Sequence, residues 1–376
     1  MLFLNNTSTV FTLIVFSFSA HKNLVESDSE ALMLHFTILD FQQKPMHSSH
    51  DFEQILAPPF PFTSQSGFIF SESNTIEMSS QEHCGFIGLI GRPNVGKSTL
   101  LNKLIGQDLS ITTPKPQTTR NRLIGIRTQG ASQMVFIDTP GIHESNLPLN
   151  RKMIDYAVKA LEETDLNLWL VEPLKPHLKE PHPDDKKILD LIRNSNNKTI
   201  LVINKMDLAD RARVLRTIDV FSQNGSFAEI IPLSALKSTN LESLLEQLEQ
   251  YLPEHPFFFE SDQLTDASER FLVAELVREQ IFRKLQQELP YSTAVQVERF
   301  EEDPNCLRID CLVCVERESQ KGILIGKGGT MLKQIGTAAR EKIEKLLGQR
   351  VFLALHVKVV KQWTRKTHHL QALGYH

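Results

Sequence analysis

The chain has 376 residues, of which 41% are hydrophobic and 23% are charged, and its formal net charge is −4. These values exclude a collagen, a coiled-coil rod and a wholly disordered chain, and the length suggests two or three domains. Four cysteines are too few for a disulfide scaffold, and they favour a reducing compartment.

The charge is unevenly distributed along the chain. Residues 1–77 carry two lysines and eight acidic residues, which give this segment a net charge of −6. Residues 318–376 carry eleven basic residues against three glutamates, which give +8. A basic segment of this kind is typical of a module that binds nucleic acid.

The first 77 residues contain half of the phenylalanines and show no pattern of helix or strand. Their apolar run at 10–20 is shorter than the roughly 20 residues that a membrane span needs. No Lys or Arg precedes this run, as a signal peptide would require. We interpret the extension as an upstream start placed in error, with Met78 as the true start, in preference to a disordered extension or a targeting peptide.

A phosphate-binding loop is predicted soon after Met78. Residues 86–90 are an apolar run typical of a buried strand, and G-x4-G-K-S and an amphipathic helix at 99–105 follow. Strand, glycine-rich loop and helix in this order hold phosphates with backbone amides and a helix N-terminus. Lys97 is expected to reach the β- and γ-phosphates, and Ser98 to bind Mg²⁺. The residues assigned to nucleotide binding here are Gly91, Arg92, Pro93, Asn94, Val95, Gly96, Lys97, Ser98 and Thr99.

A polar loop interrupted by prolines, residues 112–120, precedes a strand predicted at 122–128. A threonine hydroxyl in such a loop would complete the Mg²⁺ shell when a γ-phosphate is bound. The sequence offers Thr118 and Thr119, of which we prefer Thr119. A plain connecting loop is the alternative.

The next predicted strand, residues 134–137, ends in Asp138-Thr139-Pro140-Gly141. An acid at this place can hold Mg²⁺ through water, and a glycine lets a backbone amide approach the γ-phosphate. The predicted metal ligands are therefore Ser98, Thr119 and Asp138. The predicted catalytic residues are Lys97, Thr119 and Gly141.

Two further motifs favour guanine over adenine. The strand at 199–203 ends in Asn204-Lys205-Met206-Asp207, and the strand at 228–233 leads into Ser234-Ala235-Leu236. A carboxylate at Asp207 can accept hydrogen bonds from guanine N1–H and N2–H₂, which adenine lacks, so a buried carboxylate would reject adenine. All these motifs follow strands, at the edge where open α/β sheets bind ligands. The sequence therefore predicts GTP or GDP as the ligand.

A second domain follows the helix predicted at 239–252. We expect a first domain at 80–252, a proline-rich linker at 253–265 and a second domain at 266–376. Periodicity in the second domain predicts the order α-β-β-α-α-β. Its elements are expected at residues 266–288, 292–300, 306–316, 319–325, 330–347 and 351–360.

The sequence Gly326-Lys327-Gly328-Gly329 lies between two predicted helices, inside the basic segment. A G-x-x-G turn lets a nucleic-acid backbone approach closely, and the apolar residues 323–325 before it would line a groove for single-stranded bases. A plain helical hairpin turn with a solvated basic face is the alternative. The predicted RNA-binding residues are Ile325, Gly326, Lys327, Gly328 and Gly329.

Cys311 and Cys314 have a spacing found in metal sites, but both lie within one predicted strand. An offset of three residues places their side chains on opposite faces. We predict one core thiol and one surface thiol, and no metal pair. The histidines show no zinc-ligand spacing either.

Several motifs together resemble the Era family of bacterial GTPases over about residues 80–376. They are GRPNVGKSTLLNKL, QTTRNR, DTPGIH, NKMDL, SALKSTNLESL, ELPYSTAVQVERF, VERESQKGILIGKGG and VKVVKQW. The resemblance implies an α/β P-loop GTPase domain followed by an α+β type II KH domain. It also implies GTP hydrolysis, and binding to the 3′ end region of small-subunit (16S) rRNA during assembly of the 30S subunit. A cytoplasmic monomer is expected, with peripheral inner-membrane contact and no transmembrane span.

Three features bear on mechanism. Ile142 occupies the place where Ras-type enzymes have a water-orienting glutamine, so slow intrinsic turnover is expected. Asn94 is a candidate ligand for K⁺ near the phosphates. The tail after Trp363 is basic, whereas Era-like tails often carry acids there.

Two other functions compete with this interpretation. One is a membrane-surface signalling GTPase whose basic tail binds anionic lipid. The other is an RNA-binding module whose GTPase has decayed. The intact Lys97, Ser98, Asp138 and Asp207 argue against the second alternative.

Overall fold

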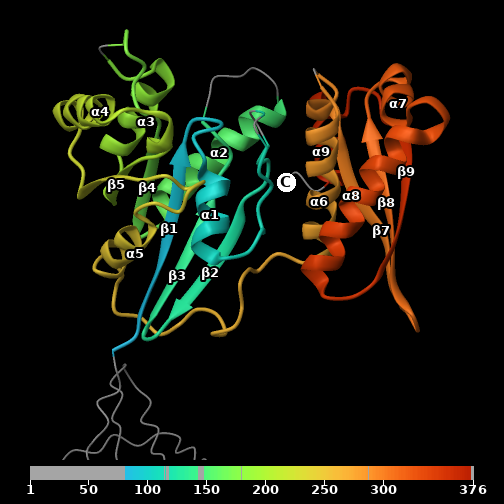
Figure 1. The fold of residues 1–376 in the computed structure, drawn as a ribbon, viewed down its shortest axis with the longest axis horizontal. Helices are drawn as coiled ribbons and strands as arrows, with labels where there is room; N and C mark the ends of the chain where they lie inside the picture. The colour runs from blue at the N-terminus through green and yellow to red at the C-terminus, as the bar shows by residue number, and fades with distance from the viewer. Residues whose placement is uncertain are drawn as a thin grey trace, which may run out of the picture. The chain divides into compact units, whose positions relative to one another are not determined.

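The computed structural model describes residues 81–373, except 114, 116–117, 143–147, 179 and 287. The extension predicted at residues 1–77 lies outside the described residues. The described chain forms a six-stranded sheet followed by a three-stranded sheet, each with its own helices (Figure 1).

The first sheet has the strand order β2-β3-β1-β4-β5-β6. Neighbouring strands are parallel except for the antiparallel pair β2 and β3. Because β3 and β4 flank β1 on opposite sides, the strand order reverses at β1, and its carboxyl end is where such a sheet binds ligands. The strands are β1 (His83–Gly91), β2 (Leu123–Gln129), β3 (Ser132–Asp138), β4 (Leu166–Val171), β5 (Lys198–Ile203) and β6 (Glu229–Pro232).

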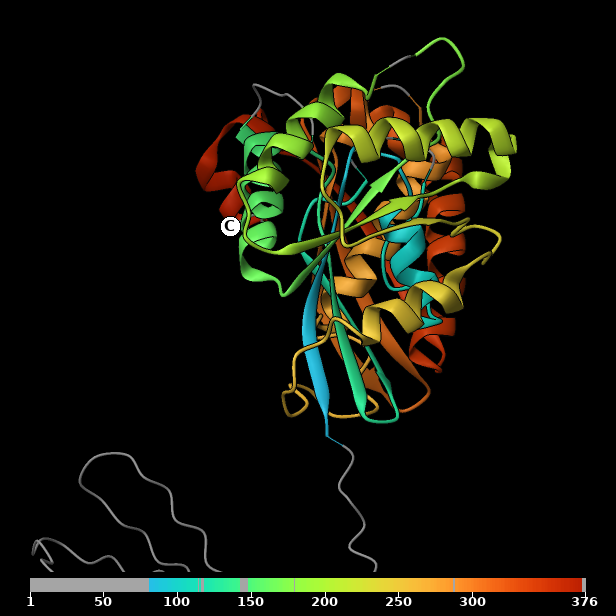
Figure 2. The same cartoon turned by 90° about the vertical axis from the view of Figure 1, so that its left-hand side faces the viewer.

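Helices cover both faces of this sheet. Helices α1 and α5 share one hydrophobic core with residues such as Ile87 and Leu168, and α2, α3 and α4 share another with Ile90 and Trp169. The turn between β2 and β3 lies beside the start of β1, at the end opposite to the motif-bearing edge (Figure 2). The helices are α1 (Lys97–Ile105), α2 (Pro148–Glu163), α3 (Pro183–Arg193), α4 (Arg211–Asn224) and α5 (Leu241–Glu249).

The segment predicted as a linker, residues 253–265, is bound to the first sheet at its end. The backbone amide of Ile126 donates to the carbonyl of Leu264 at 2.8 Å. The hydroxyl of Thr265 donates to the carbonyl of Ile124 at 2.6 Å. Ile124 and Ile126 both lie on β2, the edge strand of this sheet. The linker therefore covers part of the free edge of the sheet.

The second sheet has the order β7-β8-β9, in which β8 is antiparallel to β7 and parallel to β9. Helices α6, α7 and α8 pack on one of its faces around residues such as Val277, Ile309 and Ile335. This is the predicted α-β-β-α-α-β order, followed by one more helix. The elements are α6 (Glu269–Lys284), β7 (Ala294–Asp303), β8 (Cys306–Val315), α7 (Glu318–Ile325), α8 (Thr330–Leu347), β9 (Val351–Val359) and α9 (Thr367–Ala372).

Helix α6 ends at Lys284, four residues before the predicted end. Leu285 leaves the helix with extended backbone, φ −104° and ψ 155°, while its amide still donates to Ile281. The side chains of Leu285 and Leu289 are buried in the core of the second sheet. Burial of these two leucines therefore takes the place of the last helical turn.

The prediction of a surface thiol in β8 was wrong. Cys311 and Cys314 do face opposite sides of the strand, but they are 0% and 1% exposed. Cys311 packs under α6 to α8, whereas Cys314 packs against Trp363 and Leu370. The second face is buried because the C-terminal segment folds back over it. Among the described residues, no cluster of His, Cys, Asp and Glu could hold a metal ion.

Candidate nucleotide site and RNA-binding loop

Two glycines let the predicted motifs approach one another at the carboxyl end of β1. Gly96 has φ 102°, and a Cβ there would lie 2.3 Å from the amide nitrogen of Asn204. A Cβ on Gly141 would lie 2.5 Å from the backbone nitrogen of Pro93. These distances are shorter than any side chain allows, so the sequence uses glycine at both places. The phosphate loop, DTPG and NKMD thereby form one site.

Lys97 is the first residue of α1 and is only 5% exposed. Its Nζ donates to the carbonyl oxygens of Gly91 and Arg92, both at 3.0 Å, so the ammonium group spans the loop. Burial lowers the pKa of Lys97 to about 8, although nearby Asp138 opposes the shift. A buried ammonium group of this kind is stabilised when an anionic ligand arrives.

Asp138 is fully buried at the end of β3. Its Oδ2 accepts hydrogen bonds from Ser98 Oγ at 2.7 Å and from Ser110 Oγ at 2.8 Å. Its Oδ1 has no hydrogen-bond partner among the described residues. Burial raises the pKa of this carboxyl group, while Lys97 and the hydroxyl groups oppose the shift. An unpaired buried carboxylate oxygen is suited to a cation or to its water ligand.

The structure distinguishes the two candidate threonines. The Oγ1 of Thr119 lies 2.8 Å from Ser98 Oγ. Thr118 instead bonds Thr113 Oγ1 and the carbonyl of Lys115, both at 2.8 Å. Two hydroxyl oxygens and one carboxylate therefore meet at Ser98. These hard oxygen donors, together with the unpaired Oδ1 of Asp138, fit Mg²⁺.

Asn204 and Lys205 tie the NKMD motif to the phosphate loop. The side-chain Nδ2 of Asn204 donates to the carbonyl of Val95 at 2.8 Å, and its Oδ1 accepts from the backbone amide of Ala235 at 2.9 Å. Lys205 donates to the carbonyl of Asn94 at 2.6 Å and pairs with Glu172. The predicted guanine residues thus share a framework with the residues that would hold phosphates.

Asp207 differs from the expectation of a buried carboxylate. It lies in the short turn η2 (Met206–Leu208) and is exposed to solvent. Ser234 Oγ donates to its Oδ1 at 2.6 Å, which fixes the carboxylate. The neighbouring Leu236 is 66% exposed. If Asp207 is to reject adenine, the bound base itself would have to cover and desolvate the carboxylate.

The DTPG motif is anchored beneath the site. Thr139 Oγ1 donates to the carbonyl of Leu89 at 2.7 Å, and Pro140 and Gly141 are buried. Ile142 is also buried and packs with Trp169 and other residues under α2 and α3. An apolar, buried side chain at this position cannot orient a water molecule. Thr99 follows in the first turn of α1 and is half-buried.

The predicted RNA loop is an exposed glycine turn between α7 and α8. Gly326, Gly328 and Gly329 have φ values of 76°, 60° and 79°, in the region that favours glycine. A Cβ on Gly328 or Gly329 would meet no atom within 4 Å, and Lys327 is exposed. The loop is therefore open to a large ligand.

The apolar residues before this loop are only partly where the sequence predicted them. Ile323 is 58% exposed and Ile325 is half-buried, as a groove would require. Leu324 is fully buried in the core with α6 and α8, so it does not line a groove. Helical geometry explains the difference, because consecutive residues of α7 point in different directions.

Two contributors to the nucleotide site were missed. Ser110 bonds Asp138, and Asp185 in the first turn of α3 forms an ion pair with Arg92, with Oδ1 and Nε 2.8 Å apart. Burial raises the pKa of Asp185 to about 6, against the opposing effect of Arg92. The pair ties the phosphate loop to α3. Neither a single serine in a loop nor an aspartate early in a helix is a recognisable signal in the sequence.

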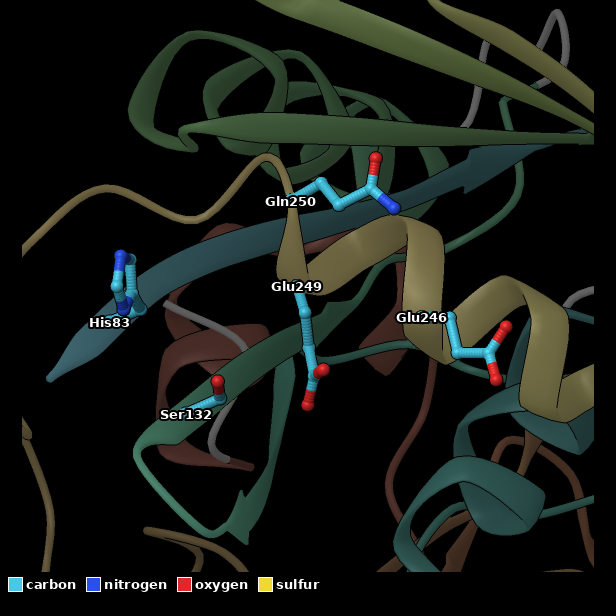
Figure 3. A pocket seen from close by; sticks show the side chains of 5 residues that line it. All are labelled: His83, Ser132, Glu246, Glu249 and Gln250. Carbon is cyan, nitrogen blue, oxygen red and sulfur yellow. The ribbon is translucent and has the colours of Figure 1, made fainter. Parts of the chain in front are cut away.

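A surface hollow lies at the other end of the first sheet (Figure 3). It is lined by His83, Ser132, Glu246, Glu249 and Gln250, near the starts of β1 and β3 and the end of α5. It contains none of the predicted site residues. Its two carboxylates make it unsuited to a phosphate group.

Comparison with known proteins agrees with this geometry. Residues 86–205 match the family described as 50S ribosome-binding GTPase, and residues 288–364 match the KH domain family. The GTPase Era of Syntrophus aciditrophicus is 48% identical over 77% of this chain and 94% of that protein. The GTPase Era of Geobacter metallireducens is 46% identical over 77% of this chain and 97% of that protein.

Two solved structures are similar over nearly their whole length. An Era variant of Aquifex aeolicus bound to GDP·AlF4⁻ has a TM-score of 0.74 and 38% identity, covering 78% of this chain and 99% of that one. Era in complex with MgGDPNP and nucleotides 1506–1542 of 16S ribosomal RNA has a TM-score of 0.75 and 39% identity, with the same coverage. The predicted fold class is confirmed: the chain belongs to the Era family of GTPases, with an α/β P-loop GTPase domain followed by a type II KH domain.

Proposed function

We propose that this GTPase binds the 3′ end region of 16S rRNA under the control of its bound nucleotide, and that it assists assembly of the 30S subunit. The observation that carries the proposal is the presence of two sites in one chain. One is a buried phosphate site in which Thr119 meets Ser98, and the other is an exposed GKGG loop. The solved Era complex with 16S rRNA nucleotides supports this choice of RNA.

The phosphate loop performs the chemistry mainly by positioning and charge stabilisation. Lys97 and the backbone N–H groups of residues 94–98 would bind the β- and γ-phosphates, and the amide of Gly141 would approach the γ-phosphate. Ser98, Thr119 and Asp138 would hold Mg²⁺, which when bound neutralises phosphate charge. Because Ile142 is buried and apolar, intrinsic turnover should be slow.

The nucleotide state would be read by the two segments that face the γ-phosphate, residues 112–120 and 138–141. With GTP bound, Thr119 and Gly141 have a ligand to engage. After hydrolysis this ligand is lost, and the segments are free to relax. Guanine would be selected by Asp207, which Ser234 holds in place, and by the Asn204 framework.

The first experiment measures the dissociation constant of an RNA copied from the 16S rRNA 3′ end, with GDPNP and with GDP. Tighter binding with GDPNP is expected. The variant Gly328→Asp places a negative charge in the loop without a clash and should abolish binding. Gly348→Asp is the matched control, because Gly348 also has positive φ and open space. It lies at the far end of α8, about 27 Å away for an 18-residue helix.

The membrane-surface alternative is not favoured, because the similar solved structure is an Era complex with 16S rRNA nucleotides. Within the described parts of the chain, no helix has the length and apolar character to cross a bilayer. The basic tail would suit anionic lipid, but lipid binding does not require a turn with three glycines. Vesicles of anionic phospholipid provide the test, since Gly328→Asp should leave most lipid affinity intact. Unchanged RNA binding by Gly328→Asp would overturn the proposed function.

Other details remain predictions. A K⁺ ion near Asn94 is supported by the position of that residue, which is exposed in the phosphate loop with φ 65°. Equal GTPase rates in K⁺ and in Na⁺ would contradict it. We also propose that the protein is a cytoplasmic monomer with peripheral contact to the inner membrane. Sedimentation and fractionation experiments would test these properties.

A further inference from the structure

The segment that precedes β2 is bonded to the KH domain by positively charged side chains. Both sheets belong to one compact unit. Lys115 of this segment donates to the carbonyl of Phe282 at 2.5 Å, and Arg278 of α6 donates to the carbonyl of Thr118 at 2.6 Å. Both acceptors are backbone carbonyl oxygens, so these contacts depend on the position of the main chain. Lys115 and Thr118 are therefore bonded to α6, one as a donor and the other as an acceptor.

Arg120 makes the most extensive of these contacts. It is 3% exposed, and its guanidinium group lies 5.8 Å from the ring centroids of both Phe282 and Trp363. Its nitrogens donate to three backbone carbonyls around the short turn η3 (Pro290–Ser292). The acceptors are Pro290 at 3.1 Å, Tyr291 at 2.8 Å and Thr293 at 2.8 Å. A rigid, planar group with several donors fixes this turn more firmly than a lysine would.

The same turn is bonded to the helix that carries the GKGG loop. The side-chain Nε2 of Gln320 donates to Ser292 Oγ at 2.8 Å. Gln320 Oε1 accepts from the backbone amides of Glu316 at 2.8 Å and Arg317 at 3.0 Å, and so caps the start of α7. Helix α7 ends directly before Gly326. Ser292 thus joins the turn that holds Arg120 to the helix that positions the RNA loop.

Thr119, which meets Ser98, and Arg120 are adjacent in the chain. A shift of Thr119 with the nucleotide state therefore moves the backbone of Arg120 as well. We propose that Arg120, Ser292 and Gln320 are positioning residues that transmit this shift from the nucleotide site to α7 and the GKGG loop. The inference rests on the proposed nucleotide control of RNA binding and assigns that control to particular side chains.

A purely structural role for these contacts makes a different prediction. Contacts that only hold two domains together would change RNA affinity equally with either nucleotide. A transmitting contact changes the ratio of the two affinities instead. The decisive quantity is therefore the ratio of the dissociation constants measured with GDP and with GDPNP.

The central test uses Ser292→Ala, which removes the oxygen that accepts from Gln320. Thr293→Val is the matched control. It removes the neighbouring buried hydroxyl, which donates to the carbonyl of Leu289 at 2.8 Å, and leaves the carbonyl that Arg120 uses. Couplings between sites are typically about 5- to 150-fold. We expect the wild-type ratio to fall to near unity in Ser292→Ala and to persist in Thr293→Val. Ser292 contacts neither the nucleotide site nor the GKGG loop, so GTPase activity should be unchanged.

A second pair of variants tests the other end of the route. Arg120→Gln should also bring the ratio to near unity. Arg122→Gln is its control, because Arg122 pairs with Glu163 within the GTPase domain, 3.6 Å apart. The double variant Arg120→Gln/Ser292→Ala should lose no more than either single variant, since both interrupt one route. If Arg120→Gln does not fold, the comparison of Ser292→Ala with Thr293→Val still decides.

The outcomes separate the two proposals. If wild-type protein binds RNA equally with GDP and GDPNP, the proposed function fails, and this inference fails with it. If the wild type distinguishes the nucleotides and Ser292→Ala keeps the full ratio, only the assignment to these residues is overturned. Loss of the ratio in Ser292→Ala alone, with Thr293→Val unchanged, supports it.

Discussion

The phosphate loop and the GKGG loop are both glycine turns that lead into a helix, but their surroundings are opposite. Gly96 precedes α1 with φ 102°, and Gly329 precedes α8 with φ 79°. A side chain at Gly96 would collide with Asn204, whereas one at Gly329 would meet nothing within 4 Å. The first turn is enclosed by other motifs of the sheet, and the second projects into open space.

This difference matches the size of the ligand each turn would take. An enclosed site can surround a small ligand with buried, fixed groups such as Lys97 and Asp138, which need little reorganisation during reaction. An open loop admits a polymer that extends beyond it on both sides, and its contacts depend on exposed charge and on salt. The same local motif, a glycine turn before a helix, can therefore bind a small ligand or a polymer, depending on the residues that pack around it.

The largest effect is expected from removal of the buried lysine. Lys97→Ala deletes the only charged group bonded to both Gly91 and Arg92 in the described site. The rate of GTP hydrolysis at saturating nucleotide should fall about 10²- to 10³-fold, as for loss of one charge-stabilising donor. Single-turnover assays measure this rate. Lys103→Ala on the exposed face of α1 is the control, and an equal decrease there would contradict a specific role.

Asp185 tests how strongly the enclosure depends on burial of charge. Its pKa, raised to about 6, lies above the ordinary value of 3.8. Its contribution to stability is therefore full below about pH 4 and is lost as the pH rises through about 6. The free energy of unfolding should change over this range by up to about 3 kcal/mol relative to Asp185→Asn. Urea denaturation at several pH values measures this change. If the free energy of unfolding varied with pH in the same way in the wild type and in Asp185→Asn, a raised pKa would be excluded.

Asp138→Asn keeps the shape of the buried side chain and removes its charge. Mg²⁺ strengthens GDPNP binding, and this gain should be about 10- to 100-fold smaller in the variant than in the wild type. This is the range found for residues that hold a metal through a water ligand. Binding measured with Mg²⁺ and with EDTA isolates this part. The protein without nucleotide should become no less stable, because a buried carboxylate with an unpaired Oδ1 has been neutralised. Equal loss of affinity with and without Mg²⁺ would argue against a metal role.

The smallest effect is expected in the open loop. Lys327→Ala should weaken RNA binding only a few-fold and should reduce the slope of log affinity against log salt by about one. Titrations at several salt concentrations measure the slope. Lys345→Ala, at the other end of α8 and also exposed, is the control. A decrease in RNA affinity of about 10²-fold or more, as large as the fall in GTPase rate expected for Lys97→Ala, would mean that the loop is more enclosed in its complex than the free structure indicates.

Much of this architecture was accessible from the sequence because the informative residues are local. Each nucleotide motif follows its own strand, and parallel strands bring their carboxyl ends to one edge. Burial of Lys97 and Asp138 follows from that position. The alternation of β8 likewise predicted which way Cys311 and Cys314 face.

What the sequence did not predict depends on contacts between distant segments. Asp185 approaches Arg92 only after α3 has packed on the sheet, and Arg120 finds its carbonyl partners 170 or more residues away. Cys314 is buried only because Trp363 and Leu370 return over β8. Periodicity identifies a buried face, but it does not identify the segment that covers it.

The bond between Ile126 and Leu264 also has a consequence for handling the protein in pieces. Strand β2 is at the edge of its sheet, and exposed edges pair readily with other chains. A GTPase fragment that stops at residue 252 would expose this edge and should self-associate. A fragment extended to Thr265 would retain the covering segment and remain dispersed. The connector between the two domains therefore also guards the first one against aggregation.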